Sequence, residues 1–455
     1  MTLYTKFVDN AVVLVTASSS PGTGYATVAS VEAAVNQART NGVPLFIRPG
    51  TYQTTEIVVD STAGGGAPAY ITAVPGTVDL QLTSGNNLLT INGISNCKIE
   101  NVTLDANNVT FSNLSISSAA LQLDSCSGLE IINCTIINSV ACGIYADQVS
   151  DSLIQGCVVS ACSYGIWGLD SLLSVDNNFV SACSNNGIML WTSTVTGNSS
   201  SITNNKIFSI NSGSGTGQFG NGINVFRAVA VNVVSNVISG CQYSAIRCNG
   251  GGDAIIVGNN CYGSRENAIF IEAPAAGINF NNGVVSGNII DTAGGGITIA
   301  NSGGGDQGTS RSVAITGNQM SNINKWDITD PGYVPTNGNG VGIYCEGACV
   351  ISGNLVDTAA GFGIIAGHNF ASHDINVNAN LVLNSPIGIG YGTGTGAGQL
   401  VISGNQIQGA TGGAIVSVTY DDTTGNVART AGSTDYGNQY DAQEGDIFVG
   451  NNRSY

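Results

Sequence analysis

The chain has 455 residues, of which 63 are glycine and only 9% are charged, and its formal net charge is −17. This negative charge, without a basic stripe, would repel a phosphate backbone, so we expect no nucleic-acid partner. No apolar run reaches the roughly 18 residues of a membrane-spanning helix, so we expect no membrane span.

The first predicted elements form a cap at the N-terminal end. Residues 30–39 have a helix-capping Ser30 followed by apolar residues at helical spacing. A strand over residues 43–47 and the run Pro49-Gly50-Thr51-Tyr52 come next. We expect this helix to cover the first open edge of a sheet, because exposed edges recruit other chains. The only apolar run before it, Val12 to Val15, has no basic residues in front, so we predict no signal peptide in this chain.

Two short signals then alternate along most of the sequence at a basic spacing of about 21 to 23 residues. One is Gly or Ala followed by Ile and a short strand, as at Gly143-Ile144, Gly165-Ile166 and Gly187-Ile188. The other is an Asn flanked by apolar residues in one register, at Asn178, Asn205, Asn236, Asn259, Asn288, Asn318, Asn354, Asn380 and Asn405. Units this short bury their apolar face only by stacking on their neighbours.

The repeat therefore predicts an all-β fold: a single-stranded right-handed parallel β-helix with an Asn ladder and an N-terminal capping helix. Each coil would pair with the coils above and below it at about 4.8 Å. The stacked Asn side chains would bond to one another and satisfy a buried turn. We expect one domain over residues 1–455, with a cap over about 1–50, coils over about 51–415 and a second cap over about 416–455.

Twelve cysteines would suit a disulfide framework, but the aligned repeats indicate otherwise. Cys162, Cys183 and Cys241 share one turn position, and Cys134 adjoins Cys157 on the next coil. Cys248 and Cys345 are predicted to face inward. We expect most of the twelve to be buried free thiols, although neighbouring coils are close enough for some pairs to oxidise.

The opening helix, strand and Pro-Gly-Thr-Tyr run, followed by Asn-laddered coils, resembles the pectin-lyase-like superfamily. The segments Gly222 to Ala228, Tyr243 to Arg247 and Glu266 to Glu272 are similar to a group of twin-arginine-translocated β-helix repeat proteins of uncharacterised function. This narrower resemblance covers roughly residues 30–420 and implies the fold and export, but no established reaction. The chain departs from the group in having no twin-arginine signal. Superfamily relatives include polysaccharide lyases, hydrolases, epimerases and phage tailspikes, so the resemblance alone selects no chemistry.

Strand alternation places the first and third residues after each inward Ile on one outer face. The predicted face carries aromatic rings, acids and arginine, which suit sugar rings and uronates because CH groups stack on rings and Arg pairs with carboxylates. The candidate substrate-binding residues are Trp167, Trp191, Asn224, Phe226, Arg227, Phe270, Tyr344 and His368. Insertions at about 211–220, 301–311 and 325–340 are predicted to wall this face. The alternative is an ordinary solvated face.

Glu272 and Glu346 are the predicted acid and base, with Arg247 as a third catalytic candidate. They share one register on coils separated by a single coil, so their backbones would lie roughly 9.6 Å apart. Leaning side chains would bring the carboxyl groups into the range of about 6.5–9.5 Å found in inverting glycosidases. Arg247 would steady substrate charge or neutralise a uronate in a lyase, or form only a surface ion pair with Glu272. Asp147 and Asp170 form a second acidic pair.

These observations favour a protein that binds polysaccharide and cleaves it, as a glycoside hydrolase or polysaccharide lyase, in a groove along one sheet. The alternative is a non-catalytic virion structural or adhesive protein, such as a phage tailspike, collar or decoration component. We expect an extracellular, periplasmic or virion location, and assembly as a homotrimer or within a larger particle. No cofactor or metal is expected; Asp421-Asp422 is a weak calcium signal.

Overall fold

The computed structural model describes part of the chain, with gaps mainly in loops and at the N-terminus. The described residues are 12–14, 30–110, 118–212, 217–273, 278, 280–300, 311–324, 340–367, 373–393, 398–421, 426–437, 441–444 and 447–455. They fall into two compact units. Unit 1 comprises residues 1–193 and 200–206, and unit 2 comprises residues 194–199 and 207–455. The prediction of one domain over the whole chain stays a prediction.

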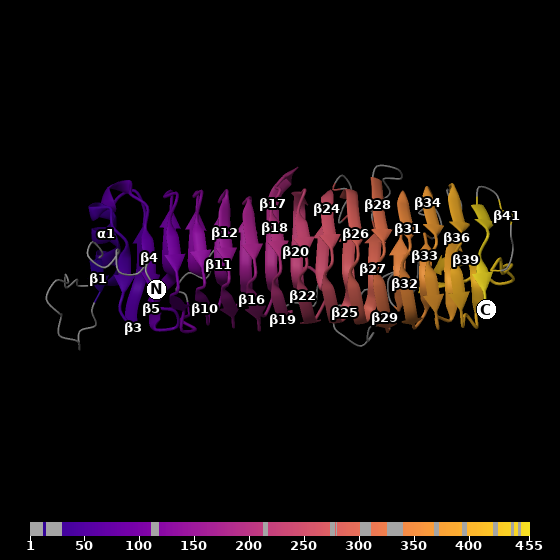
Figure 1. Cartoon of the computed structure of the whole chain (residues 1–455), viewed down its shortest axis with the longest axis horizontal. Coiled ribbons are helices and arrows are strands. Elements are labelled where there is room, and N and C mark those ends of the chain that lie inside the picture. Colours follow the sequence, from indigo (N-terminus) through magenta and orange to yellow (C-terminus); the bar gives the residue numbers. More distant parts are fainter. Residues whose placement is uncertain are drawn as a thin grey trace, which may run out of the picture. The chain divides into compact units, whose positions relative to one another are not determined.

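Unit 1 is built from coils of three short strands, and each strand pairs in parallel with the equivalent strand of the next coil (Figure 1). The first sheet contains β8 (Ala119–Asp124), β11 (Cys142–Asp147), β14 (Tyr164–Leu169) and β17 (Asn186–Gly197, in this unit up to Ser193). The second contains β1 (Val12–Leu14), β2 (Leu45–Ile47), β4 (Tyr70–Ala73), β6 (Lys98–Glu100), β9 (Glu130–Ile132), β12 (Ser152–Gln155), β15 (Leu173–Asp176) and β18 (Ser201–Thr203). The third contains β7 (Thr103–Asp105), β10 (Thr135–Ile137), β13 (Val158–Ser160) and β16 (Phe179–Ser181), while β3 (Gly50–Val59) pairs with β5 (Val78–Asn92), which runs through the third and first sheets.

Unit 2 repeats this arrangement. Its first sheet contains β20 (Asn221–Val229), β23 (Ile246–Asn249), β25 (Asn260–Glu272), β27 (Ile289–Ala300), β30 (Val341–Cys345), β33 (Phe362–Ala366), β36 (Ile387–Gly392) and β39 (Gly413–Asp421). The second contains β21 (Asn232–Val234), β24 (Gly251–Val257), β26 (Phe280–Ser286), β28 (Arg311–Thr316), β31 (Cys349–Ser352), β34 (Ile375–Asn378), β37 (Leu400–Ser403) and β42 (Ile447–Gly450). The third contains β19 (Lys206–Ile210), β22 (Val237–Cys241), the first residues of β25 and β27, β29 (Gln319–Ile323), β32 (Leu355–Ala359), β35 (Leu381–Leu383), β38 (Gln406–Gln408) and β43 (Arg453–Ser454).

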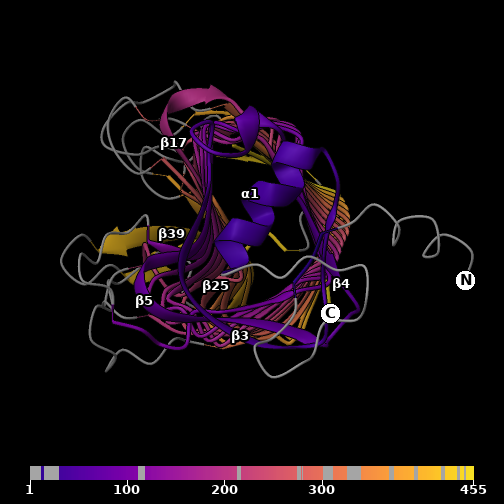
Figure 2. The same cartoon turned by 90° about the vertical axis from the view of Figure 1, so that its left-hand side faces the viewer.

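The helix α1 (Val31–Asn41) covers the open end of the first coils of unit 1, as predicted (Figure 2). Ser30 caps it by accepting a hydrogen bond from the Ala33 amide, and Gly42 ends it in the left-handed conformation. Its buried face includes Arg39, whose guanidinium donates to the carbonyl oxygens of Ala67 and Asp60. These bonds fasten the lid to the coil beneath it.

The predicted Asn ladder is confirmed. In unit 2 each ladder Asn donates one amide hydrogen bond to the Oδ1 of the next, from Asn236 through Asn405 and on to Asn452. Asn178 and Asn205 form the corresponding pair in unit 1. The residue before each ladder position is left-handed, as at Gly258 and Gly317, so the chain turns there and leaves backbone groups for the Asn to satisfy.

The C-terminal segment combines an extension with a last coil. Strand β39 continues past its coil and pairs antiparallel with β40 (Asn426–Arg429). The chain then returns through β41 (Asp441–Glu444) to stack β42 on β37 and β43 on β38. Asn452 extends the ladder beyond the last Asn of the sequence pattern.

Ten of the twelve cysteines are free and buried, as predicted. Cys134 and Cys157 occupy the ladder register on the coils before Asn178, which accepts a hydrogen bond from the Cys157 amide. Burial raises the pKa of Cys241 and of Cys248 to about 12. Cys345 and Cys349 are joined in a disulfide within one turn. Oxidation was expected between cysteines of neighbouring coils. The two cysteines of this disulfide instead lie on consecutive strands of one coil, β30 and β31.

We predict that a thiol reagent will modify few groups in the native protein, because all ten free thiols are buried and out of reach of the reagent. Unfolding without reductant should expose all ten, and added reductant should raise the total to twelve. A count near zero after unfolding would show extensive disulfide formation and contradict this assignment.

Candidate functional site

An aromatic cluster, defined here as Tyr145, Tyr164, Trp167 and Trp191, lies on the outward side of the first sheet of unit 1. Strand register aligns Tyr145 with Trp167 on consecutive coils, and Leu169 with Trp191. The Trp167 ring centroid is 4.8 Å from that of Tyr164 and 6.4 Å from that of Trp191. Tyr145 meets Trp167 edge to face at 5.6 Å. Each ring is therefore held by its neighbours in a fixed orientation.

The expectation of a fully exposed aromatic stripe is wrong in unit 1. Trp167 retains only 5% of its exposure and Tyr145 only 4%, because neighbouring side chains of the same and adjacent coils cover them. Trp191 and Tyr164 remain partly exposed at the margin of the cluster. The indole Nε1 of Trp167 has no hydrogen-bond partner among the described residues. Tyr164 was not predicted, because it precedes the Gly-Ile pair from which outward positions were counted.

Acidic side chains adjoin the aromatic cluster. Asp147 is the register partner of Asp124 on the preceding coil, and Asp170 follows the end of β14. The pKa of Asp147 is raised, first because burial disfavours its charged form and then because Asp124 and Asp170 are nearby anions. The Asp170 carboxylate accepts hydrogen bonds from the amide and hydroxyl of Ser193 at 2.7 and 2.6 Å. This margin of the cluster therefore offers carboxylate acceptors rather than cations.

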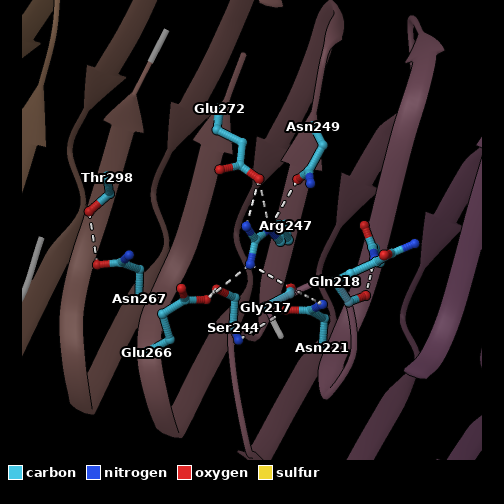
Figure 3. Close-up of polar contacts among 11 residues, drawn as sticks. Gly217, Gln218, Asn221, Ser244, Arg247, Asn249, Glu266, Asn267, Glu272 and Thr298 are labelled. Carbon is cyan, nitrogen blue, oxygen red and sulfur yellow. Dashed lines mark hydrogen bonds and ion pairs between the residues drawn. The ribbon is translucent and has the colours of Figure 1, made fainter. Parts of the chain in front are cut away.

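A second polar cluster surrounds Arg247 on the first sheet of unit 2 (Figure 3). The guanidinium Nη2 lies 2.6 Å from Glu272 Oε1, and Nη1 lies 3.3 Å from Glu266 Oε2. Its Nε also donates to Glu272 and to the Asn249 amide oxygen. Its plane lies over the Phe270 ring, 4.8 Å from the centroid.

Arg247 is thus not the plain surface ion pair of the simplest prediction. Its side chain and that of Glu266 are 10% and 6% exposed, so both charges are largely removed from water. Burial raises the pKa of Glu266, and the Arg247 charge and a hydrogen bond from the Ser244 hydroxyl act in the opposite direction. Glu266 was missed as a site residue because it lies three residues before the inward Ile269, outside the positions that were counted.

The Arg247 cluster also holds part of the first predicted insertion. The Gly217 carbonyl oxygen accepts hydrogen bonds from Arg247 Nη1 and from the Asn221 amide. Asn224 donates to the Gln218 carbonyl oxygen and is 2% exposed, so its predicted exposure to a substrate is wrong. Residues 217 and 218 therefore cover this part of the face, held there by these hydrogen bonds.

Glu272 and Glu346 occupy the predicted register, two coils apart. Glu272 pairs with Ala300, and the Glu346 amide donates to the Ile299 carbonyl oxygen of the same coil as Ala300. Glu272 keeps some exposure, at 17% of its side chain, whereas Glu346 is buried and accepts a 2.6 Å hydrogen bond from the Tyr344 hydroxyl. Tyr344 is itself buried against Phe362 and Val418, so the expectation that it is exposed is wrong.

The remaining predicted binding residues divide into three groups. Phe226 and Arg227 are half-buried, with the Arg227 guanidinium 4.7 Å from the centre of the Phe226 ring. Phe270 is buried beneath Arg247, which corrects its predicted exposure. His368 and the insertions at 301–310 and 325–339 lie outside the described residues.

The described residues contain no group of three or more His, Cys, Asp and Glu side chains that could hold a metal ion. The side chains of the Asp421-Asp422 pair lie outside the described residues. Within the described part of the chain, no helix is both long enough and apolar enough to cross a membrane.

Comparison with known proteins now supports the fold. A family model described as a right-handed beta helix region matches residues 77–207. The fold is a right-handed parallel β-helix. It is the fold of the pectin-lyase-like superfamily, as the sequence resemblance implied. The narrower likeness to twin-arginine-translocated proteins stays a prediction. Comparison with curated proteins finds no significant sequence match.

Solved structures resemble this β-helix at low sequence identity. The pre-mature gene product 12 of bacteriophage phi29 is 14% identical with a TM-score of 0.55, over 86% of this chain and 54% of that one. Its N-terminal fragment is 15% identical with a TM-score of 0.53, over 86% and 66%. The A-module of the mannuronan C-5 epimerase AlgE4 from Azotobacter vinelandii is 14% identical with a TM-score of 0.51, over 80% and 95%. This chain therefore spans about half the length of the first phage protein, and these likenesses establish the fold.

Proposed function

We propose that this protein binds a neutral polysaccharide at the aromatic cluster of unit 1, outside the cell or on a virion. The observation that carries the proposal is the set of adjoining rings on consecutive coils, Tyr164, Trp167 and Trp191, at 4.8 and 6.4 Å. Partly exposed rings at the margin of a rigid sheet provide stacking surfaces for the CH faces of sugars. Coils repeat at about 4.8 Å, so the partly exposed rings of neighbouring coils would contact successive parts of an extended sugar chain.

The electrostatics favour a neutral polymer over a polyuronate. Asp124, Asp147 and Asp170 adjoin the rings, and the whole chain carries a net charge of −17. These carboxylates accept hydrogen bonds from sugar hydroxyls but repel sugar carboxylates. Arg247, the cation first considered for uronate binding, is already paired with Glu266 and Glu272.

Structural neighbours support a polysaccharide ligand and the location in general terms, but they do not bear on the charge of the polymer. One is named as an enzyme of mannuronan, and two are structures of a phage protein. The phage neighbours support a virion adhesive or structural role for this chain. Assembly into a homotrimer or a larger particle stays a prediction. Binding at the aromatic cluster is common to the enzymatic and the adhesive forms of the proposal.

Replacing Trp191 with Ala is expected to weaken binding to the preferred neutral polysaccharide about tenfold or more, which corresponds to at least about 1.4 kcal/mol. The measurement is isothermal titration with dextran, mixed-linkage β-glucan and galactomannan, with alginate and polygalacturonate as acidic counterparts. Tyr262→Ala is the matched control, because Tyr262 is 51% exposed on β25 in the third sheet of unit 2. Equal affinity of the wild type and Trp191→Ala for every bound polymer would contradict the proposal.

Cleavage of the bound polymer is the second candidate, and it is favoured by the common register of Glu272 and Glu346. Backbones two coils apart are separated by roughly 9.6 Å, and inverting glycosidases hold their two carboxyl groups about 6.5–9.5 Å apart. The partly exposed Glu272, paired with Arg247, would serve as the base that holds water. Glu346, hydrogen-bonded to Tyr344, would protonate the leaving oxygen after a side-chain movement that exposes it.

Under this candidate, Glu272→Gln and Glu346→Gln are each expected to abolish the release of new reducing ends. Both variants should still bind the polymer, because neither residue belongs to the aromatic cluster. Absorbance at 232 nm with polygalacturonate, followed in parallel, tests the lyase alternative, which needs a uronate substrate and an Arg247 released from Glu266 and Glu272. Full activity in both variants would remove this pair, and an inert wild type that still binds would leave the adhesive role.

A further inference from the structure

Unit 2 has an apolar row on the outside of its second sheet, on the opposite side of each strand from the core. Register aligns one outward residue from each of seven consecutive strands, β24, β26, β28, β31, β34, β37 and β42. The row consists of Ile255, Val284, Ala314, Val350, Asn376, Val401 and Phe448. Five of these are large apolar side chains with exposed fractions between 36% and 44%.

We infer that this row is the contact surface for a second copy of the same chain. Scattered exposed apolar residues need no explanation, but a contiguous row of them marks an interaction surface. The row has one aromatic ring and is otherwise aliphatic apart from Asn376, so it offers no series of rings or polar groups to a sugar polymer. A partner that fits every rung must repeat at the same spacing of about 4.8 Å, and a second copy of this sheet does so.

Charge also favours a second copy at this face. Two chains of net charge −17 repel each other over most of their surfaces. The next outward row on the same sheet is Val257, Ser286, Thr316, Ser352, Asn378, Ser403 and Gly450, so neither row has an ionisable side chain. Like-charged copies can therefore approach at this face without placing charged side chains of the two rows against each other.

The acids beside the row select one orientation of the pair. Asp253 and Asp374 each lie two residues before the row residue of their own strand, so they flank the row on one side only. A two-fold axis along the strands would keep the acids of both copies on the same side of the interface. A two-fold axis along the stack of coils places them against the neutral row that contains Ser352 and Asn378. We therefore infer a parallel dimer in which each row residue faces its own equivalent.

The size of the face indicates a modest affinity. The two rows contribute 14 outward residues per copy, whereas a stable interface uses about 20–30 residues per partner. The flanking positions add several more. We expect monomers at about 1 µM and dimers at about 100 µM, with association strengthened by salt because salt screens the net repulsion.

Sedimentation equilibrium of the full chain tests the inference. The wild type should approach twice the chain mass of 46.1 kDa at high concentration, more readily at 0.5 M than at 0.05 M salt. Val350→Glu, at the middle of the row, should remain monomeric because it places two carboxylates against each other. Val237→Glu is the control: this valine is 39% exposed against 44% for Val350, but lies on the third sheet. A wild type that stays monomeric at about 100 µM, or a Val350→Glu variant that dimerises as the wild type does, would overturn the inference.

Discussion

Arg247→Met is expected to lower the free energy of unfolding by about 3–5 kcal/mol, the usual effect of removing one partner from a buried ion pair. The substitution keeps most of the side-chain volume but leaves Glu266 and Glu272 without their common cation. Glu266 is affected more strongly, since its side chain is 6% exposed and its pKa is already raised by burial. The Gly217 carbonyl oxygen also loses the Arg247 donor, which weakens the attachment of residues 217 and 218 to the face.

Chemical denaturation followed by circular dichroism measures this loss. Arg227→Met is the matched control, because Arg227 lies on the same sheet and stacks on an aromatic ring but is half-buried. It should change stability by less than about 1 kcal/mol. Adding Glu266→Gln to Arg247→Met should recover part of the loss by removing the stranded charge. Equal effects of Arg247→Met and Arg227→Met would show that the buried network contributes no more than a surface arginine.

Asn318→Ala is expected to destabilise the fold by about 3 kcal/mol. Asn318 is completely buried in the middle of the ladder, and its amide donates to the Val285 carbonyl oxygen and to Asn354. Its Oδ1 accepts from both the backbone amide and the side chain of Asn288. Truncation leaves several buried groups unsatisfied, each at a cost of about 1–3 kcal/mol, partly relieved by relaxation or water.

The position of an Asn in the ladder should determine the size of this effect. Asn452 ends the ladder, so Asn452→Ala removes fewer contacts and only the last coil should open. The exposed Asn260, on β25, should tolerate Ala with a change below about 0.5 kcal/mol. Denaturation midpoints combined with hydrogen exchange distinguish global from terminal opening. Similar losses for Asn318→Ala and Asn260→Ala would contradict the structural role of the ladder.

The fold could be predicted because its signals are local and repeated. A left-handed residue followed by a buried Asn recurs once per coil from Asn178 onward, and the capping residues Ser30 and Gly42 directly flank α1. The Asn register identified the ladder from Asn178 to Asn405 because each of these coils makes the same turn and uses an Asn side chain to satisfy its backbone groups. The sequence pattern did not include Asn452, because the segment between β39 and β42 interrupts the regular spacing before it.

The site could be predicted only in part, for a physical reason. Strand alternation tells on which side of a strand a residue lies, but not what covers it. Tyr344 does point outward from its strand, yet Phe362 and Val418 from later strands bury it. Trp167 is covered by Tyr164 of its own strand and by Tyr145, Met189 and Trp191 of the adjacent coils. Such covering depends on contacts between segments far apart in the sequence, which a repeat alignment does not contain.

Tryptophan emission tests the central claim most directly, because it reports on the aromatic cluster itself. Replacing Trp326, the third tryptophan, with Phe leaves Trp167 and Trp191 as the only indoles. Titration of this variant with the neutral polysaccharide that it binds should give a saturable change in emission, at the concentrations at which calorimetry detects binding. Alginate should give no such change. Calorimetric binding of the neutral polymer without any change in emission would place the ligand away from the aromatic cluster and contradict the account.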